Sequence, residues 1–280
     1  MLLDAFAAEQ LRLLKARWTL FWAYAFWPIL VLLSGVGTHL FFNHMIRKSG
    51  AAADMARAPM DLGRQALEAL QGGGFIVALA FFTVGAVSVL ASDYRWETWR
   101  LLTPRNTRAN LVIAKLMTVG GAAAAGLVLL MVAGVLSGLA GALINGHPIV
   151  VSETPGFPKL FAGLFLTAWA DVMWMAALAA CLAVITRSQV GAILATLGVA
   201  IFEGVIMGQL PMPDPTNPPL KFLAFMPGLC SNTVRNAILT GPMDIAPSNA
   251  PLAALILIAW IVGLSALAVF LFKRQDLTRE

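Results

Sequence analysis

The chain has 280 residues, of which 59% are hydrophobic and 12% are charged, and its formal net charge is +5 at pH 7. Because a soluble domain carries about 25% charged residues, this composition excludes an ordinary soluble globule, a disordered chain and a disulfide scaffold. It is typical of a polytopic helical membrane protein, since lipid accepts long apolar helices with few charges. We therefore expect an all-α fold with a single transmembrane domain over residues 1–280.

Residues 1–18 have the pattern of an amphipathic helix. Apolar side chains recur at spacings of three and four, at Leu3, Ala7, Leu11, Leu14 and Trp18. The acidic and basic residues of this segment fall on the opposite arc. The apolar run that follows is too long for the core of a cleavable signal peptide. We expect the segment to lie in the membrane interface and to lead into the first span.

Uncharged apolar runs predict six spans. We place them near Leu20–Leu40, Phe75–Ala91, Leu111–Leu139, Leu160–Ile185, Val190–Gln209 and Leu252–Phe272. An even number of spans puts both termini on one side of the membrane. If that side is the cytoplasm, most of the 19 Lys and Arg residues fall in the shorter, cytoplasmic segments, as the positive-inside rule requires. We therefore predict cytoplasmic termini.

The segment 210–250 is predicted to be an extracytoplasmic loop with short helices. It is rich in proline, and a helix is expected between the prolines over Leu229–Leu239. The chain has two cysteines; Cys181 falls in a span and Cys230 in this loop. We therefore predict no disulfide.

The sequence contains none of the common catalytic, nucleotide-binding or metal-binding motifs. It has no Walker A motif, no His-Glu-x-x-His, no Gly-x-Ser-x-Gly and no Cys-x-x-Cys. We therefore predict that the chain is not an enzyme and has no catalytic residue, metal site or cofactor of its own. Its basic residues lie between spans, which favours topology signals and lipid headgroup contacts over nucleic acid.

The loop over residues 93–108 has the most informative sequence. Residues 93–103 are predicted to form a short helix that Pro104 ends. Trp96 and Trp99 alternate there with arginines, and large aromatics beside arginine are typical anchors of protein interfaces. An interfacial aromatic belt with positive charges would have the same composition. The residues alone leave both interpretations open.

This loop resembles a segment of type-2 ATP-binding-cassette exporter permeases. The resemblance is carried by Asp93-Tyr94, Glu97-Thr98, Arg100-Leu101-Leu102-Thr103, Arg108 and Ala114-Lys115. The six-span layout, the interfacial N-terminal helix and the outer loop before the last span extend it over the whole chain. One departure is Glu97, which stands where such permeases commonly have glycine.

The resemblance implies a function and partners. The loop would be a coupling helix in a groove of a cytoplasmic ABC ATPase subunit, with contacts from Tyr94, Trp96, Glu97, Arg100 and Leu101. Two ATPase copies would hold the ATP and Mg, and a second permease copy or a paralogue would complete a dimeric translocation pathway. It also implies a bacterial cytoplasmic (inner) membrane. It names no transported substrate and leaves homodimer and heterodimer open.

Asp171 and Glu203 are acidic residues inside predicted spans. An ionisable group at that depth costs several kcal/mol unless it is paired or hydrated, so such residues are candidates for function. Asp171 lies roughly 16 Å along its helix from Leu160, and Glu203 roughly 9 Å from Gln209, both counted from the outer side. They are candidate residues of the translocation pathway, or carboxyls that fix helix packing.

Two functions of other classes are compatible with the sequence. A proton-coupled secondary transporter would use Asp171 and Glu203 as proton carriers, and would call for inverted repeats or broken spans. A membrane anchor that recruits a cytoplasmic partner would use only the loop over 93–108.

Overall fold

The computed structural model describes residues 1–49, 59–71, 73–95, 98–99, 106–154, 156–209, 218–240 and 246–275. Six helices in these ranges are long and apolar enough to cross a membrane, which confirms the predicted all-α polytopic fold. The only strands in the described residues are the two-residue β1 (Met60–Asp61) and β2 (Ile149–Val150), which pair in parallel. The sequence did not predict them.

The six candidate spans are formed by helices that follow one another in the chain. In order they are α3 (Phe26–Ser49) with the segment before it, α5 (Gly73–Arg95), α7 (Arg108–Asn145), α8 (Phe157–Thr186), α9 (Gln189–Gln209) and α12 (Ala250–Arg274). The remaining helices are α1 (Leu2–Lys15), α2 (Arg17–Leu20), the π-helical segment η1 (Phe21–Ala25), α4 (Leu62–Ala69), α10 (Leu220–Phe225) and α11 (Pro227–Leu239).

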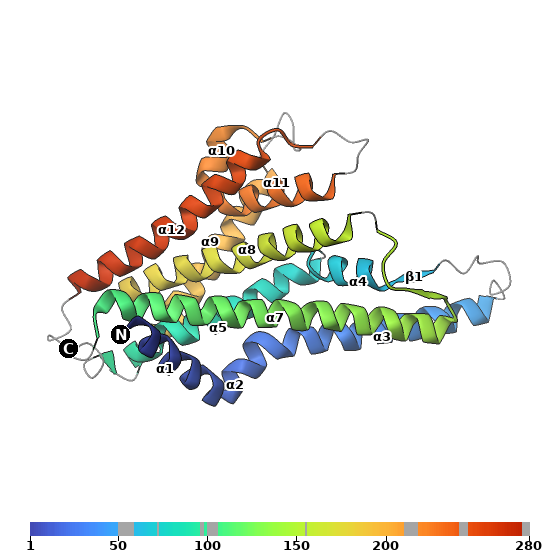
Figure 1. The fold of residues 1–280 in the computed structure, drawn as a ribbon, viewed down its shortest axis with the longest axis horizontal. Coiled ribbons are helices and arrows are strands. Elements are labelled where there is room, and N and C mark those ends of the chain that lie inside the picture. The colour runs from blue at the N-terminus through green and yellow to red at the C-terminus, as the bar shows by residue number, and fades with distance from the viewer. Residues whose placement is uncertain are drawn as a thin grey trace.

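The helices run along the length of the molecule, and the N-terminus lies at the same end as the last turn of the final helix (Figure 1). We call this the inner end, after the predicted orientation, and the opposite one the outer end. Helices α10 and α11 lie beside the first turns of α12, away from the termini, and α4 lies beside α7 towards the outer end.

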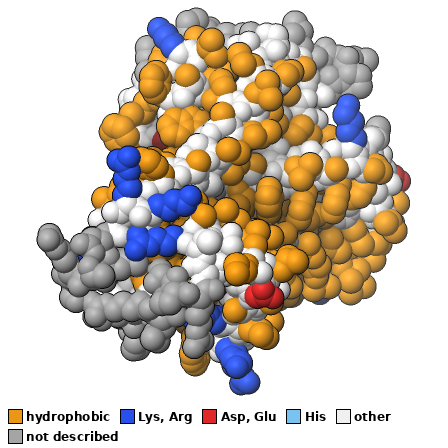
Figure 2. All heavy atoms as spheres, turned by 60° about the vertical axis from the view of Figure 1, so that its left-hand side comes forward, with side chains coloured by type: hydrophobic (Ala, Val, Ile, Leu, Met, Phe, Trp, Pro, Cys, Tyr) orange, Lys and Arg blue, Asp and Glu red, His pale blue; other side chains and the backbone are white. Residues whose placement is uncertain are grey.

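Basic side chains gather at the inner end. Among the described residues, exposed Lys and Arg side chains there include Arg12, Lys15, Arg17, Arg187, Lys273 and Arg274. Figure 2, which brings this end forward, shows Lys and Arg around it and apolar side chains over much of the remaining surface. This distribution suits a protein whose inner end meets water and lipid headgroups while its sides meet lipid tails.

Helix α7 is longer than the sequence predicted. The prediction was Leu111–Leu139, whereas the helix covers 38 residues from Arg108 to Asn145, or about 57 Å at 1.5 Å per residue. The hydrocarbon core is about 30 Å thick, so α7 extends well beyond it. The prediction was too short because it used the span length as a limit, although the first helix breaker is Gly146, which has a left-handed conformation.

Small residues let neighbouring elements approach α7 closely. A Cβ atom added at Gly126 would lie 2.6 Å from the Phe82 ring, and one at Gly141 would lie 2.5 Å from the His39 ring. Both distances are too short for carbon contacts, so the glycines at these positions are required by packing. This is the use of small residues that membrane helices commonly show.

The side of helix α1 that was expected to be polar faces the rest of the protein. Its buried residues are Ala5, Glu9 and Leu13. The predicted apolar stripe faces outward, and Trp18, which ends it, is 75% exposed. Such an outward apolar stripe suits a helix that rests in lipid. The inward position of Glu9 was not predicted.

Asp61 begins α4 and joins it to the loop before α8. Its carboxylate accepts hydrogen bonds from the amides of Arg64 (3.0 Å) and Glu153 (3.0 Å) and from the Thr154 hydroxyl (3.2 Å). Partial burial raises the pKa of Asp61, but these hydrogen bonds outweigh it and hold the pKa below its usual value.

We expect Asp61→Ala to weaken α4 by about 0.5–2 kcal/mol, the usual value of an N-cap. The depressed native pKa means that the carboxylate stabilises α4 fully above its unfolded pKa of about 3.9 and loses this effect as the pH falls through the native value. Amide hydrogen exchange of α4 at pH 7 and pH 5 should therefore be faster in Asp61→Ala. Asp61→Asn keeps an acceptor and should differ less from wild type; equal exchange in all three proteins at pH 7 would contradict the assignment.

Candidate functional site

A cluster of buried charges lies at the inner end, where α1, α5 and α7 meet. The Lys115 ammonium on α7 lies 2.8 Å from a carboxylate oxygen of Asp93 on α5 and 3.3 Å from one of Glu9 on α1. It also donates to the Val89 carbonyl at 2.7 Å. Lys115 is therefore the cation that joins three helices.

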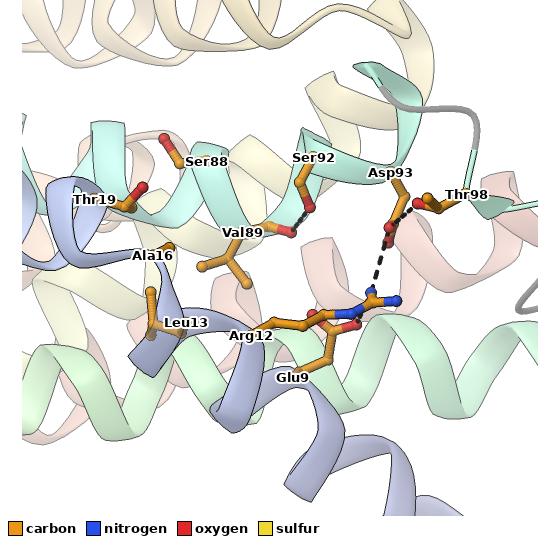
Figure 3. Close-up of a pocket in the computed structure, with 10 residues that line it drawn as sticks. All are labelled: Glu9, Arg12, Leu13, Ala16, Thr19, Ser88, Val89, Ser92, Asp93 and Thr98. Carbon is orange, nitrogen blue, oxygen red and sulfur yellow. Dashed lines mark hydrogen bonds and ion pairs between the residues drawn. The ribbon is translucent and has the colours of Figure 1, made fainter.

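Arg12 supplies the second positive charge of this cluster. Its guanidinium lies 2.9 Å from Glu9 and 3.4 Å from Asp93, and Figure 3 shows it extending from α1 towards Asp93. Lys115, Asp93 and Glu9 are only 1%, 3% and 5% exposed. Burying such charges is favourable only when they are paired and hydrogen-bonded. The two acids and two bases of this cluster meet that condition.

The same cluster holds the start of the 93–108 loop. The Thr98 amide donates to the Asp93 carbonyl at 3.1 Å, and the Thr98 hydroxyl donates to the Asp93 carboxylate. Beside them the buried Trp99 ring lies 5.5 Å from the Lys115 ammonium, a cation–π distance. The ring of Phe272 on α12 lies 4.3 Å from that of Trp99. The chain leaving α5 is thus bound to α1, α7 and α12.

The end of the loop is held by Arg108. Its guanidinium donates to the carbonyls of Phe272, Lys273 and Gln275 at 3.1, 3.0 and 2.7 Å. These carbonyls end α12, where backbone acceptors have no partner within the helix. The Tyr94 hydroxyl donates to the Gln275 side chain at 2.8 Å. Both ends of the loop are therefore attached to the last turn of the final span.

A cavity of about 260 Å³ that is lined by both polar and apolar side chains opens between α1 and α5 beside this cluster. Its lining includes Arg12, Ser88, Ser92 and Thr98, and Figure 3 shows Thr98 beside Asp93 and Ser88 farther along α5, on the side of Thr19. The Ser92 hydroxyl donates to the Val89 carbonyl. The cavity leaves Arg12 accessible to solvent while the acids behind it are buried.

Of the five predicted ATPase contacts, the structure describes Tyr94 alone. Its side chain is half-buried and packs against Trp99, with ring centroids 5.5 Å apart. Trp96, Glu97, Arg100 and Leu101 lie outside the described residues.

Sequence reasoning missed the buried partners Glu9 and Lys115. A signal was available for Lys115, because it lies inside the predicted third span and an ionisable residue at such a position is a candidate by the rule that selected Asp171.

A second pair of charges joins α8 to α11 in the outer half of the molecule. The Arg235 guanidinium lies 2.6 Å from the Asp171 carboxylate, and both side chains are largely buried. The sequence predicted Asp171 as a candidate pathway residue without a partner. In the structure, the partner of Asp171 is Arg235 on α11.

Glu203 is held by the same outer helix. One of its carboxylate oxygens, Oε1, accepts hydrogen bonds from the amides of Gly228 at 2.7 Å and Leu229 at 3.4 Å, in the first turn of α11. The first amides of a helix lack partners within it and carry partial positive charge, so a carboxylate is stabilised there. The structure therefore attaches both predicted acidic residues to α11, one near each end.

Comparison with protein families gives a match over most of the chain. The family model of the ABC-2 family transporter proteins matches residues 74–277. The match begins in α5 and includes the 93–108 loop, both acidic residues and the last span. A search of curated proteins found no match.

Proposed function

The chain belongs to the ABC-2 family transporter proteins, and from this premise we propose that it is the transmembrane subunit of an ATP-driven exporter, coupled to a separate cytoplasmic ATPase. The family and the six apolar helices make the chain a multi-pass ABC-type permease. We propose in addition that transport is outward, that ATP is its source of energy and that a cytoplasmic ATPase is its partner.

The observation that carries the proposal is the attachment of the 93–108 loop at both ends. A partner that pushes on a loop moves the spans only if the loop is fixed to them. Here the Asp93–Lys115 ion pair holds its start and the bonds of Arg108 hold its end. Displacement of the loop would therefore move α5, α7 and α12 together, as rigid-body switching requires.

The assembly follows from the same proposal. Two cytoplasmic ATPase subunits would bind ATP and Mg, and this chain would supply no cofactor. Few residues of spans α9 and α12 are buried within the chain, which leaves large apolar faces for lipid and for a second permease copy or a paralogue. We place the complex in a bacterial inner membrane. Asp171 and Glu203 would border the dimeric pathway in its outer half.

We expect Trp96→Ala combined with Glu97→Ala to detach the ATPase without unfolding the permease. Central aromatic residues at interfaces commonly contribute 2 kcal/mol or more, so the ATPase recovered with the purified permease should fall at least tenfold. The measurement is ATP hydrolysis in the material purified from native membranes. Trp18→Ala removes an exposed tryptophan on α2 and serves as the control.

Two results would contradict the proposal. One is recovery of no ATPase with the wild-type permease. The other is substrate flux that needs a proton gradient but no ATP and is lost in Asp171→Asn, which would favour secondary transport instead.

A further inference from the structure

A cavity of about 260 Å³ lies in the outer half of the molecule between α8, α9, α12 and the α10–α11 segment. Most of its lining is apolar, and four of the residues are aromatic: Trp174, Phe202, Phe225 and Trp260. Glu203 is the only charged residue among those that line it. Apolar sites with a few placed polar groups are typical of small-molecule binding.

The Glu203 carboxylate has unused capacity to accept hydrogen bonds. The side chain is 7% exposed, and Oε1 accepts from the two amides of α11. Among the residues that the structure describes, none donates to its second oxygen, Oε2. An ionised carboxylate has about four acceptor positions, so a buried ligand with positive charge would find an acceptor here.

The neighbouring cation is engaged elsewhere. Arg235 lies 2.6 Å from Asp171, so these two charges compensate each other. The indole nitrogen of Trp260 donates to the Ala224 carbonyl at 3.0 Å and is not available to Glu203. The cavity therefore combines aromatic surface with one acidic group whose charge the nearby pair does not neutralise.

We propose that this cavity binds a small amphipathic cation, with an ammonium group beside Glu203 and an apolar body between the aromatic side chains. A cation gains from aromatic faces as well as from a carboxylate, most strongly where water is excluded. As a statement about the exported substrate this rests on the proposed function, but the binding itself needs no ATPase.

A small cation fits the site better than a lipid headgroup. Glu203 lies roughly 9 Å of helix from Gln209, where α9 ends, deeper than the headgroup layer at the membrane surface. A volume of about 260 Å³ also falls below the usual 300–1,000 Å³ of drug-sized sites. The ligand is thus expected to be a membrane-dissolved amine or quaternary ammonium compound of modest size.

The test uses two probes of equal shape and different charge. Benzyltrimethylammonium carries the cation, and neopentylbenzene is its uncharged carbon isostere. Binding to the purified full chain in a nonionic maltoside detergent is measured by calorimetry, with empty micelles subtracted. We expect saturable binding of the cation at least tenfold tighter than that of the isostere. Equal affinities, or no saturable binding of the cation, would overturn the proposal.

A pair of matched variants locates the binding. Glu203→Gln keeps the side-chain size and an acceptor for the Gly228 amide, and should weaken cation binding at least tenfold while leaving the isostere unchanged. Glu153→Gln removes the same charge from an exposed position outside the cavity and should have no effect. Unchanged cation binding in Glu203→Gln would refute the assignment. Should that variant not fold, the comparison of the two probes on the wild type still tests whether the protein binds the cation more tightly than the uncharged isostere.

A competition experiment separates the two sources of an ammonium group. Dioleoylphosphatidylcholine, added in equimolar amount to the probe, should not displace it. Displacement would show that a lipid headgroup occupies the site and would overturn the assignment to a small cation. Cation binding without ATPase recovery would defeat only the proposed function, whereas ATPase recovery without cation binding would defeat only this inference.

Discussion

Replacing Lys115 with Met should lower the free energy of unfolding by about 3–5 kcal/mol, the usual cost of removing one partner from a buried ion pair. The substitution keeps the volume of the side chain but leaves the carboxylates of Glu9 and Asp93 with only the partly exposed Arg12 as a cation. It also removes the donor to the Val89 carbonyl. Helix α7 would then lose its ion pairs with α1 and α5, and only the Arg12–Asp93 pair would remain between α1 and α5.

The measurement is thermal unfolding of the purified permease in detergent. Arg64→Met is the matched control, because Arg64 forms an exposed ion pair with Glu68 at 2.7 Å, and exposed pairs contribute about 0–1 kcal/mol. Adding Asp93→Asn to Lys115→Met removes one of the unpaired charges and should recover part of the loss. An effect of Lys115→Met no larger than that of Arg64→Met would show that the cluster does not stabilise the fold.

The same substitution also tests the link between stability and coupling. Because the cluster attaches the start of the 93–108 loop to α1 and α7, its loss should reduce transport per ATP hydrolysed in the protein that remains folded. Retained coupling in folded Lys115→Met would contradict the role that we assign to the attachment.

Arg235→Gln is the second substitution with a large expected effect. It leaves the Asp171 carboxylate buried beside a neutral amide, and we expect a loss of about 3–5 kcal/mol. The double variant with Asp171→Asn has no unpaired charge and should recover at least half of that loss. A double-mutant cycle then measures the coupling energy of the pair directly.

Amide hydrogen exchange can show which helix loses stability in Arg235→Gln. Because Arg235 fixes α11 to α8, we expect the amides of α11 to exchange faster in Arg235→Gln while those of α7 keep their protection. Lys221→Gln removes a positive charge from an exposed side chain on α10 and is the control. A coupling energy near zero, with unchanged exchange in α11, would contradict the proposed attachment.

The double variant would also distinguish the two interpretations of Asp171, as a residue of the translocation pathway or as a carboxyl that fixes helix packing. A residue that only fixes packing should lose transport in proportion to stability, and the double variant should restore both. A residue that contacts substrate should leave transport impaired in the double variant even when stability returns.

The spans were predictable because their signal is local. A run of apolar residues without charge is sufficient to indicate a membrane helix, and the predicted ranges for α8, α9 and α12 overlap the observed helices closely. The length of α7 was not predictable from the span requirement, because helix formation continues wherever hydrogen bonding and packing persist. There the packing against α3 and α4 continues along the outer part of the helix.

The faces of the helices were less predictable than the helices themselves. The apolar stripe of α1 was identified and assigned to the membrane interface, but the sequence did not predict which residues of the opposite side would be buried. The structure turns that stripe outward and Glu9 inward. Only the position of Lys115 on a different helix makes a buried Glu9 favourable.

The sequence by itself determined that this is a membrane protein with six membrane-spanning helices, that its basic residues cluster at one end, and that Asp171 and Glu203 require an explanation. Only the tertiary structure decided which charged residues pair with one another. Lys115 meets Glu9 across 106 positions of the chain and Arg235 meets Asp171 across 64. The physical reason is that a charge pair is selected by proximity in a medium of low dielectric constant, and proximity between helices is set by how the helices pack rather than by their order in the sequence.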